Sequence, residues 1–535
     1  MPTQVFSIFL SLLIVVSAGS CYKKTYPQAL TQSRMVVPSD VDARLNPAPS
    51  ETPSFDNPLL RQRWQVYDQP QDWPVVSPRD RNEGGFTYTQ KELSEWRQRA
   101  EQGPYRTNGD THGNGYIYHG NYTPNDWERI VKYKNEFMAQ PDVYFNVAGK
   151  ADIGCIEAEK TYWTRESIEQ EPIKVLSAAF YALVKDDRTV MEAVKANILR
   201  LVRNRGLDFY NTAVWCEGAG RDNVANFWLS TLPMVTIRCF DYSYEVWSDQ
   251  ERSQYRYWLK GLCYYLAREV NQNLSTMILN RDINHPIPLE QYRIKDAEKC
   301  DQVPYRDALP IHRLSRYYNN RRSWMSAAAG MGGVLLKDRF LINSTKLFAR
   351  ELLAFFFYPD GTFMEHHRGD AKLPSRGLAY AANTLGYVFQ FGDMLAKSGD
   401  PDVFAYQTSF GVCATKGAVV KSYQWAILQY YKHLRREIRV YCLSCPPNPE
   451  NLIDGEHPDW HSFHDDLFIV ANCYYKDKEI RNAYLRLSDD LQHLAFTRQL
   501  AYLEVASNGP NSIWTGPGIL PGAFFMYGQM EYKAY

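Results

Sequence analysis

The chain has 535 residues, of which 45% are apolar, and its 60 basic and 60 acidic side chains give a formal net charge of zero. A chain of this length can bury a large core. The balanced charge provides no global field that would attract nucleic acid or an anionic membrane surface, so we expect neither as a partner, and a polyanionic ligand would need a local basic site.

The first 85 residues differ in character from the rest of the chain. An apolar run at 6–16, followed by small residues before Cys21, is typical of a signal peptide, which we assign to residues 1–21. Residues 18–21 loosely resemble a bacterial lipoprotein cleavage box, which would attach a lipid to Cys21. We therefore expect an exported protein, either periplasmic, extracellular or tethered to the outer membrane by a lipid. Residues 22–85, rich in Pro, Asp, Ser and Gln, indicate an extended leader.

Helical periodicity dominates residues 86–440, and no stretch there is apolar for long enough to predict a membrane span. A capping box at Ser248 and Glu251 precedes one predicted helix. Apolar residues recur at helical spacing in two neighbouring segments, at Ile173, Leu176, Phe180, Leu183 and Val184 and then at Val194, Ile198, Leu201 and Val202. Further helical segments are 324–336, 344–357, 378–396 and 422–437. Helix pairs in series predict a mainly α fold, an α/α toroid built as an incomplete barrel of helical hairpins.

The pattern changes after residue 440. A Pro-rich turn is followed by a histidine-containing segment, by an apolar run at 467–475 that predicts a strand, and by a Gly- and Pro-rich tail. We expect residues 441–535 to form a small irregular or β-containing cap that packs on the toroid.

Two segments about forty residues apart hold the most informative group of polar and charged side chains. The first is Asn319-Asn320-Arg321-Arg322-Ser323-Trp324. The second runs from Asp360-Gly361 through Glu365, His366, His367 and Arg368, and it is continued by Leu378-Ala379-Tyr380. Amide and guanidinium groups donate hydrogen bonds to a carboxylate, so these segments could bind a carboxylate-bearing ligand.

The order of these motifs resembles the alginate lyases with an α/α toroid. In that family an Asn-Asn-His-x-x-Trp helix start is followed by an Asp/Gln-Gly turn, by Glu-x-x-Arg and by Ala-Leu-x-Tyr, and the resemblance covers roughly residues 170–410. The chain departs from the family at two points: Arg321 stands in place of the histidine, and residues 369–375 lengthen the connection to Tyr380. A second Asn-His pair at Asn284-His285 offers a replacement histidine.

The resemblance implies a polysaccharide lyase that cleaves a 4-linked uronate polymer by β-elimination, with alginate as the first candidate and glucuronan or a glycosaminoglycan next. Elimination requires the C6 carboxylate to be neutralised so that the C5 proton becomes acidic, and Asn320 with Arg321 or Arg368 would do this without a metal or a cofactor. Tyr380 would act as base and acid, as the resemblance implies.

The remaining candidate residues would orient a catalytic group or contact the polymer, and several of them have an alternative structural explanation. Glu365 would orient Arg368, and Trp324, Arg322, His366 and His367 would contact the polymer. Histidine titrates near neutrality, so His285, His366 or His367 is an alternative base. Each residue also has a structural reading: Asn319 and Asn320 as helix caps, Trp324 and Tyr380 as core aromatics, and the arginines as solvated charges.

One other enzymatic reading, one candidate metal site and one binding reading stay open. Paired carboxylates at Asp360, Glu365 or Asp370 would suit an α/α-barrel glycoside hydrolase. His457, His461 and His464 have a spacing that permits metal ligation on a helix, but Pro458 and Trp460 weaken a helix there and favour a polar loop. A toroid that binds glycans without cleaving them would account for the departures at Arg321 and residues 369–375.

Overall fold

The computed structural model describes residues 45–47, 72–74, 85–102, 116–118, 121–123, 126–142, 171–203, 230–275, 318–363, 374–411, 419–444, 465–480 and 482. These residues are mainly helical, as the sequence predicts. The expected signal peptide lies outside the described residues, as does most of the expected leader.

The longer helices include all the predicted helical segments, with shifts of several residues at some ends, and also helices at 90–102, 126–139, 231–242 and 465–475 that the periodicity did not predict. They are α3 (Gln90–Gln102), α4 (Asp126–Ala139), α6 (Glu171–Lys185), α7 (Arg188–Arg203), α9 (Thr231–Tyr242), α10 (Asp249–Ser275), α12 (Asn320–Leu336), α13 (Arg339–Phe355), α15 (Pro374–Lys397), α17 (Tyr423–Ser444) and α18 (Asp465–Tyr475). The two short ones are η4 (Tyr244–Val246) and α16 (Asp402–Ala405). The predicted capping box of α10 is confirmed, since Glu251 accepts from Ser248 N at 2.9 Å and Ser248 Oγ accepts from Glu251 N at 3.3 Å.

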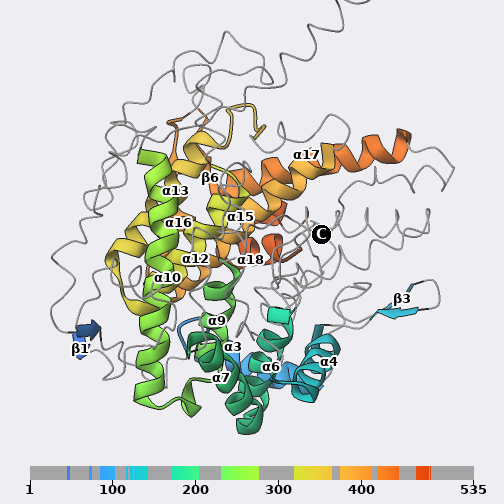
Figure 1. Cartoon of the computed structure of the whole chain (residues 1–535). Coiled ribbons are helices and arrows are strands. Elements are labelled where there is room, and N and C mark those ends of the chain that lie inside the picture. Colours follow the sequence, from blue (N-terminus) through green and yellow to red (C-terminus); the bar gives the residue numbers. More distant parts are fainter. Residues whose placement is uncertain are drawn as a thin grey trace, which may run out of the picture.

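The strands are short and form three antiparallel pairs. They are β1 (Leu45–Pro47) with β2 (Asp72–Pro74), β3 (Tyr116–Tyr118) with β4 (Asn121–Thr123), and β5 (Gln407–Thr408) with β6 (Lys421–Ser422). In Figure 1, α10 runs along one side of the molecule, α3, α4, α6 and α7 gather at one end, and α13 and α17 lie towards the other. None of the described helices is both long and apolar enough to cross a bilayer.

The predicted strand at 467–475 is wrong, because this segment forms the helix α18. Leu467, Val470, Ala471 and Tyr474 recur at helical spacing, and all four pack into the core. A short run of apolar residues fits a strand or a helix equally well, and here packing on α15 and α17 selects the helix. The described part of 441–535 is thus helical, and the rest lies outside the described residues.

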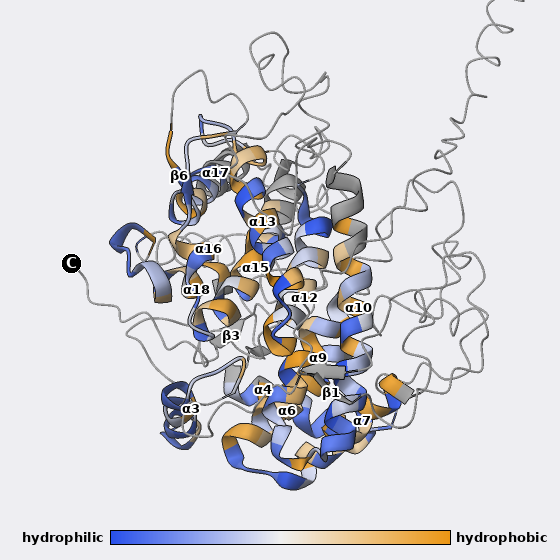
Figure 2. Cartoon of the chain, turned by 90° about the vertical axis from the view of Figure 1, so that its left-hand side faces the viewer, coloured by the Kyte–Doolittle hydropathy of each residue, from blue (hydrophilic) through white to orange (hydrophobic). Residues whose placement is uncertain are grey.

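Helix α12 forms the centre of the core. It packs against α9, α10, α13 and α15, and every residue from Arg322 to Leu336 is buried. Figure 2 shows hydrophobic residues gathered where α9, α12 and α15 meet, whereas α3 at the edge is mainly hydrophilic. A helix enclosed on all sides needs small side chains so that its neighbours can approach, and residues 326–333 are Ser, Ala or Gly at every position except Met331.

A buried network of hydrogen bonds connects residues 86 and 87, just before α3, with α9, α15 and α18. Asp241 of α9 accepts hydrogen bonds from Phe86 N at 2.9 Å, from Thr87 N at 2.7 Å and from Thr87 Oγ1 at 2.6 Å. Nearby, Lys397 of α15 donates to Thr87 O at 3.1 Å.

Lys397 also pairs with Asp393 and Glu92, each at 3.0 Å. Tyr474 of α18 donates to Asp393 Oδ1 at 2.7 Å. Burial alone would lower the pKa of Lys397, but the carboxylates of Asp393 and Glu92 outweigh it and raise that pKa. Four elements far apart in the sequence, α3, α9, α15 and α18, are thus held by charge-assisted hydrogen bonds.

We expect Gly330→Ala to destabilise the protein. An added Cβ would lie 2.7 Å from Cβ of the stiff side chain Thr345 and 2.7 Å from the Phe391 ring. Overpacking costs about 1–3 kcal/mol of stability, and we expect this cost to exceed the gain of about 1 kcal/mol from the higher helix propensity of alanine. Gly386→Ala in α15 is the matched control, because its Cβ would meet nothing within 4 Å, and it should not destabilise. Urea denaturation of both variants tests this, and an equal effect would contradict it.

We expect Asp241→Ala to lower the free energy of unfolding by about 3–5 kcal/mol, because it leaves buried donors without their acceptor. Asp249→Ala is the control: its side chain is 99% exposed and pairs only at the surface with Arg252, so stability should change little. Thermal unfolding of the two variants measures the difference. Similar melting temperatures would show that the network around Asp241 contributes little.

Candidate functional site

The first turn of α12 carries the amide and guanidinium groups of the predicted site. Asn319 is the N-cap, with extended backbone (φ −128°, ψ 174°), and its side chain accepts a hydrogen bond from Arg322 N at 3.1 Å. Asn320 is 3% exposed, Arg322 is also buried, and Arg321 is partly exposed. Asn319 therefore has the capping role that its sequence allowed, and Arg321 is the more accessible of the two arginines.

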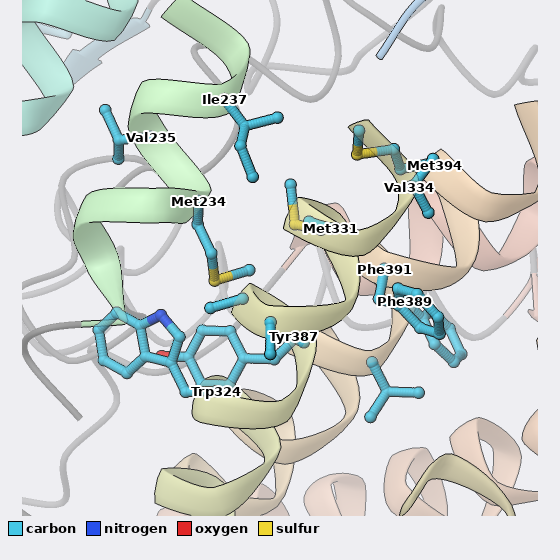
Figure 3. Close-up of a cluster of buried hydrophobic side chains, with 14 of the residues drawn as sticks. Met234, Val235, Ile237, Trp324, Met331, Val334, Tyr387, Phe389, Phe391 and Met394 are labelled. Atoms are coloured by element: carbon cyan, nitrogen blue, oxygen red, sulfur yellow. The ribbon is translucent and has the colours of Figure 1, made fainter. Parts of the chain in front are cut away.

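Trp324 lies in the core rather than on the surface. Its ring is fully buried and stacks on Tyr387 of α15, with centroids 4.6 Å apart and planes inclined by 14°. Figure 3 shows the two rings side by side, next to Met234 of α9. The buried ring packs α12 against α15, which agrees with the alternative prediction that Trp324 is a core aromatic residue.

Two contacts fix the relative direction of α12 and α15. Trp324 meets Tyr387, and further along both helices a Cβ at Gly330 would meet Phe391. Because both contacts advance in the same sense, the helices run parallel. Asn320 precedes Trp324 by about 6 Å of helix and position 380 precedes Tyr387 by about 10 Å, at 1.5 Å per residue. The backbone of Tyr380 and the first turn of α12 therefore lie at the same end of this helix pair.

A buried pair lies immediately before the first turn of α12. Tyr318 Oη donates to Glu351 Oε2 of α13 at 3.2 Å, and both side chains are fully buried. Neither residue is among those predicted from the sequence. The signal for Glu351 is a carboxylate in an otherwise apolar face of α13, since a buried acid needs a partner.

The Asp360-Gly361 turn is well defined. Asp360 Oδ1 accepts from Thr362 N at 2.9 Å and from Thr362 Oγ1 at 2.6 Å, and Gly361 has the positive φ of 86° that favours glycine. Gly361 N donates to Tyr358 O at 3.0 Å, and Phe357 bridges to Phe363 across the turn. Asp360 is thus committed to the geometry of the turn.

Elements after α15 hold this turn in place. Lys421 of β6 donates from Nζ to Ala354 O at 2.9 Å and to Phe357 O at 2.8 Å, and the lysine is 1% exposed. His433 Nε2 of α17 lies 3.1 Å from Gly361 O. Burial lowers the pKa of Lys421 to about 7. No local sequence pattern identifies these two residues, because their partners are backbone carbonyls far away in the chain.

The remaining candidates lie outside the described residues. These are His285, Glu365, His366, His367, Arg368, Asp370, His457, His461, His464 and the side chain of Tyr380. Within the described part of the chain, no group of three or more His, Cys, Asp or Glu side chains is arranged to hold a metal ion. Of the predicted site, the structure thus describes the first turn of α12, the turn at 360–361 and the backbone of position 380.

We expect the stability of the wild-type chain to rise between pH 7 and pH 10 relative to Lys421→Met. In this window the unfolded chain keeps its lysine protonated while the folded chain has lost that proton, because the folded pKa is lowered to about 7. The unfolded state binds more protons, so the difference in unfolding free energy should grow by about 1.4 kcal/mol per pH unit. Denaturation at several pH values measures the slope, and parallel profiles would contradict a neutral buried amine.

Three comparisons with known proteins found no match. No family model, no curated protein and no solved structure matches the chain. A function must therefore be inferred from its own residues and from the packing of α12, α13 and α15.

Proposed function

We propose that the chain is an exported polysaccharide lyase that cleaves a 4-linked uronate polymer, alginate first, by β-elimination. The observation that carries the proposal is the parallel packing of α12 on α15 through Trp324 and Tyr387. This packing puts the first turn of α12 and position 380 at one end of a buried helix pair. A tyrosine and carboxylate-binding groups at one end are what the elimination requires.

The overall arrangement is proposed to be an α/α toroid. The sequence order of the helical pairs supports this, as does the direct packing of α6 on α7, of α12 on α13 and of α15 on α17. A toroid would place the ends of its helices around one cleft, in which a polymer can lie across several helix termini.

The first step is neutralisation of the substrate carboxylate. Arg321, partly exposed in the first turn of α12, would pair with the C6 carboxylate, and Asn320 would donate a hydrogen bond from a site largely shielded from water. Hydrogen bonds from a preorganised, water-excluded site stabilise developing charge more than the same bonds in water. Arg368 would complete the set, with Glu365 orienting its guanidinium group.

The second step is proton transfer by Tyr380. The ionised phenol takes the C5 proton, the C4–O4 bond breaks as a C4–C5 double bond forms, and the same phenol returns its proton to the departing O4. An unperturbed tyrosine has a pKa near 10, so half ionisation at pH 7 requires a shift of about 3 units, or roughly 4 kcal/mol. Positive charge from Arg368 and Arg321 would supply this shift.

We expect an increase in the ultraviolet absorbance of unsaturated uronate when the wild-type chain is incubated with alginate. Tyr380→Phe should lower the rate by about 10²–10⁴-fold, because the proton acceptor is lost. Arg368→Ala should lower it by about 10²–10³-fold, because charge on the carboxylate is no longer stabilised. Glucuronan, hyaluronan and chondroitin, assayed in parallel, identify the preferred polymer.

Two variants control for nonspecific damage. Tyr181→Phe removes a hydroxyl from a partly exposed ring on α6 that stacks on Trp127, and Arg200→Ala removes a guanidinium that pairs with Asp142. Both should keep the wild-type rate. New reducing ends without ultraviolet absorbance would indicate a hydrolase instead, and binding without any new ends would indicate a glycan-binding toroid.

A further inference from the structure

Helix α17 carries a row of cations that the predicted site does not include. From position 432 its sequence reads Lys-His-Leu-Arg-Arg-Glu-Ile-Arg, which puts cations at Lys432, Arg435, Arg436 and Arg439. At about 3.6 residues per turn, these four positions fall within an arc of about 100° on one side of the helix. The acid in this stretch, Glu437, falls roughly on the opposite side. We call the four positions the basic face of α17.

The other side of α17 packs against the body of the protein. The helix contacts α15, α16, α18 and β6, and its buried residues include Tyr423, Ala426, Ile427 and Tyr430. Lys432 follows Tyr430 by about 200° around the helix, and its side chain is exposed. In Figure 1 the end of α17 extends away from α15 and α18. The basic face is therefore centred opposite the packed side.

One edge of the basic face meets the turn at 360–361. A Cβ at Gly361 would contact the side chain of Gln429, and His433 Nε2 lies 3.1 Å from Gly361 O. Position 436 falls near the same edge of the helix as Gln429, about two turns or 10 Å further on. The basic face thus begins beside this turn of the predicted site and leads away from it along the helix.

The spacing of the cations weakens the helix unless anions lie beside them. Lys432 and Arg436 are four residues apart, as are Arg435 and Arg439, and like charges at this spacing repel each other across one helical turn. A ligand with negative charges at regular intervals would remove this repulsion. Because the four positions extend over about 10 Å of helix, they favour a polyanion over a single small anion.

Among polyanions, an acidic polysaccharide fits this surface best. A helix that binds a bilayer buries its apolar face there, whereas the apolar side of α17, with Tyr423, Ile427 and Tyr430, packs on the protein. The zero net charge of the chain provides no long-range attraction for nucleic acid. A uronate polymer carries a carboxylate on each uronate unit, and arginine pairs with carboxylates through two parallel hydrogen bonds.

We propose that the basic face of α17 is a binding site for an acidic polysaccharide, which holds the polymer on one side of the bond that is cleaved. The link to catalysis rests on the proposed lyase function. The binding itself is a separate claim that can be measured without turnover.

The test replaces all four cations by glutamine, which has a similar helix propensity: Lys432→Gln, Arg435→Gln, Arg436→Gln and Arg439→Gln. Calorimetry measures alginate binding in chains that also carry Tyr380→Phe, so that the polymer stays whole. At low salt, Kd should rise by about tenfold or more, because several ion pairs with the polymer are lost together. At about 1 M salt the two values of Kd should converge, because the charges are screened.

The matched control removes the same number of charges elsewhere. Its four substitutions to glutamine fall on exposed residues of α3, α7 and α13, namely Lys91, Arg97, Arg188 and Arg339. Kd should stay within about twofold, because distant charges act on the polymer only through a screened field. Replacing Arg435, Arg436 and Arg439 by lysine keeps the charge and should retain most of the affinity.

In the chain with Tyr380 intact, the glutamine variant should raise KM for alginate by about tenfold while kcat stays within about twofold, since uniform binding is lost. An unchanged Kd, or an equal loss in the control, would overturn the proposal. Tighter binding of the same face to single-stranded DNA or to phosphatidylglycerol vesicles than to alginate would also overturn it. A wild-type chain that binds alginate through this face without cleaving it would refute the proposed function and support the binding site.

Discussion

The structure depends on one helix being enclosed by others. Helix α12 contacts α9, α10, α13 and α15, and its buried run of Ser, Ala and Gly residues lets all four come close. Close packing makes the helix intolerant of added volume, and it also fixes the register of each neighbour. The position of the first turn of α12, and thus of Asn320 and Arg321, follows from this packing rather than from local loops.

Polar groups close the same assembly at its periphery. Residues before α3 bind to Asp241 of α9, α3 itself binds through Glu92 to Lys397 of α15, and α18 binds through Tyr474 to Asp393. Such groups cost free energy when buried and recover it only when every partner is present. The network therefore stabilises only the arrangement of the four elements in which all its hydrogen bonds form, whereas apolar contacts are less directional.

The sequence predicted local structure well and distant contacts poorly. The periodicity in α6 and α7, the capping box of α10 and the helical segments of α12, α13, α15 and α17 all follow from spacing within a few residues. The prediction of a strand at 467–475 is wrong, because this segment forms a helix that packs on α15 and α17. The hydrogen bonds of Asp241 to Thr87 and of Lys421 to Phe357 join residues remote in sequence, so no local sequence pattern predicts them.

Two buried lysines show how partner chemistry decides the behaviour of one residue type. Lys397 faces Asp393 and Glu92, so its pKa is raised and it stays charged throughout the physiological range. Lys421 faces two carbonyls, whose dipoles compensate for burial far less than a full negative charge would, and its pKa falls to about 7. Lys397 therefore binds α3 and α15 in the same way over that range, whereas Lys421 changes charge near neutrality. The second lysine bonds to the backbone on both sides of the end of α13, so a change of pH near neutrality acts on the link between α13 and the turn at 360–361.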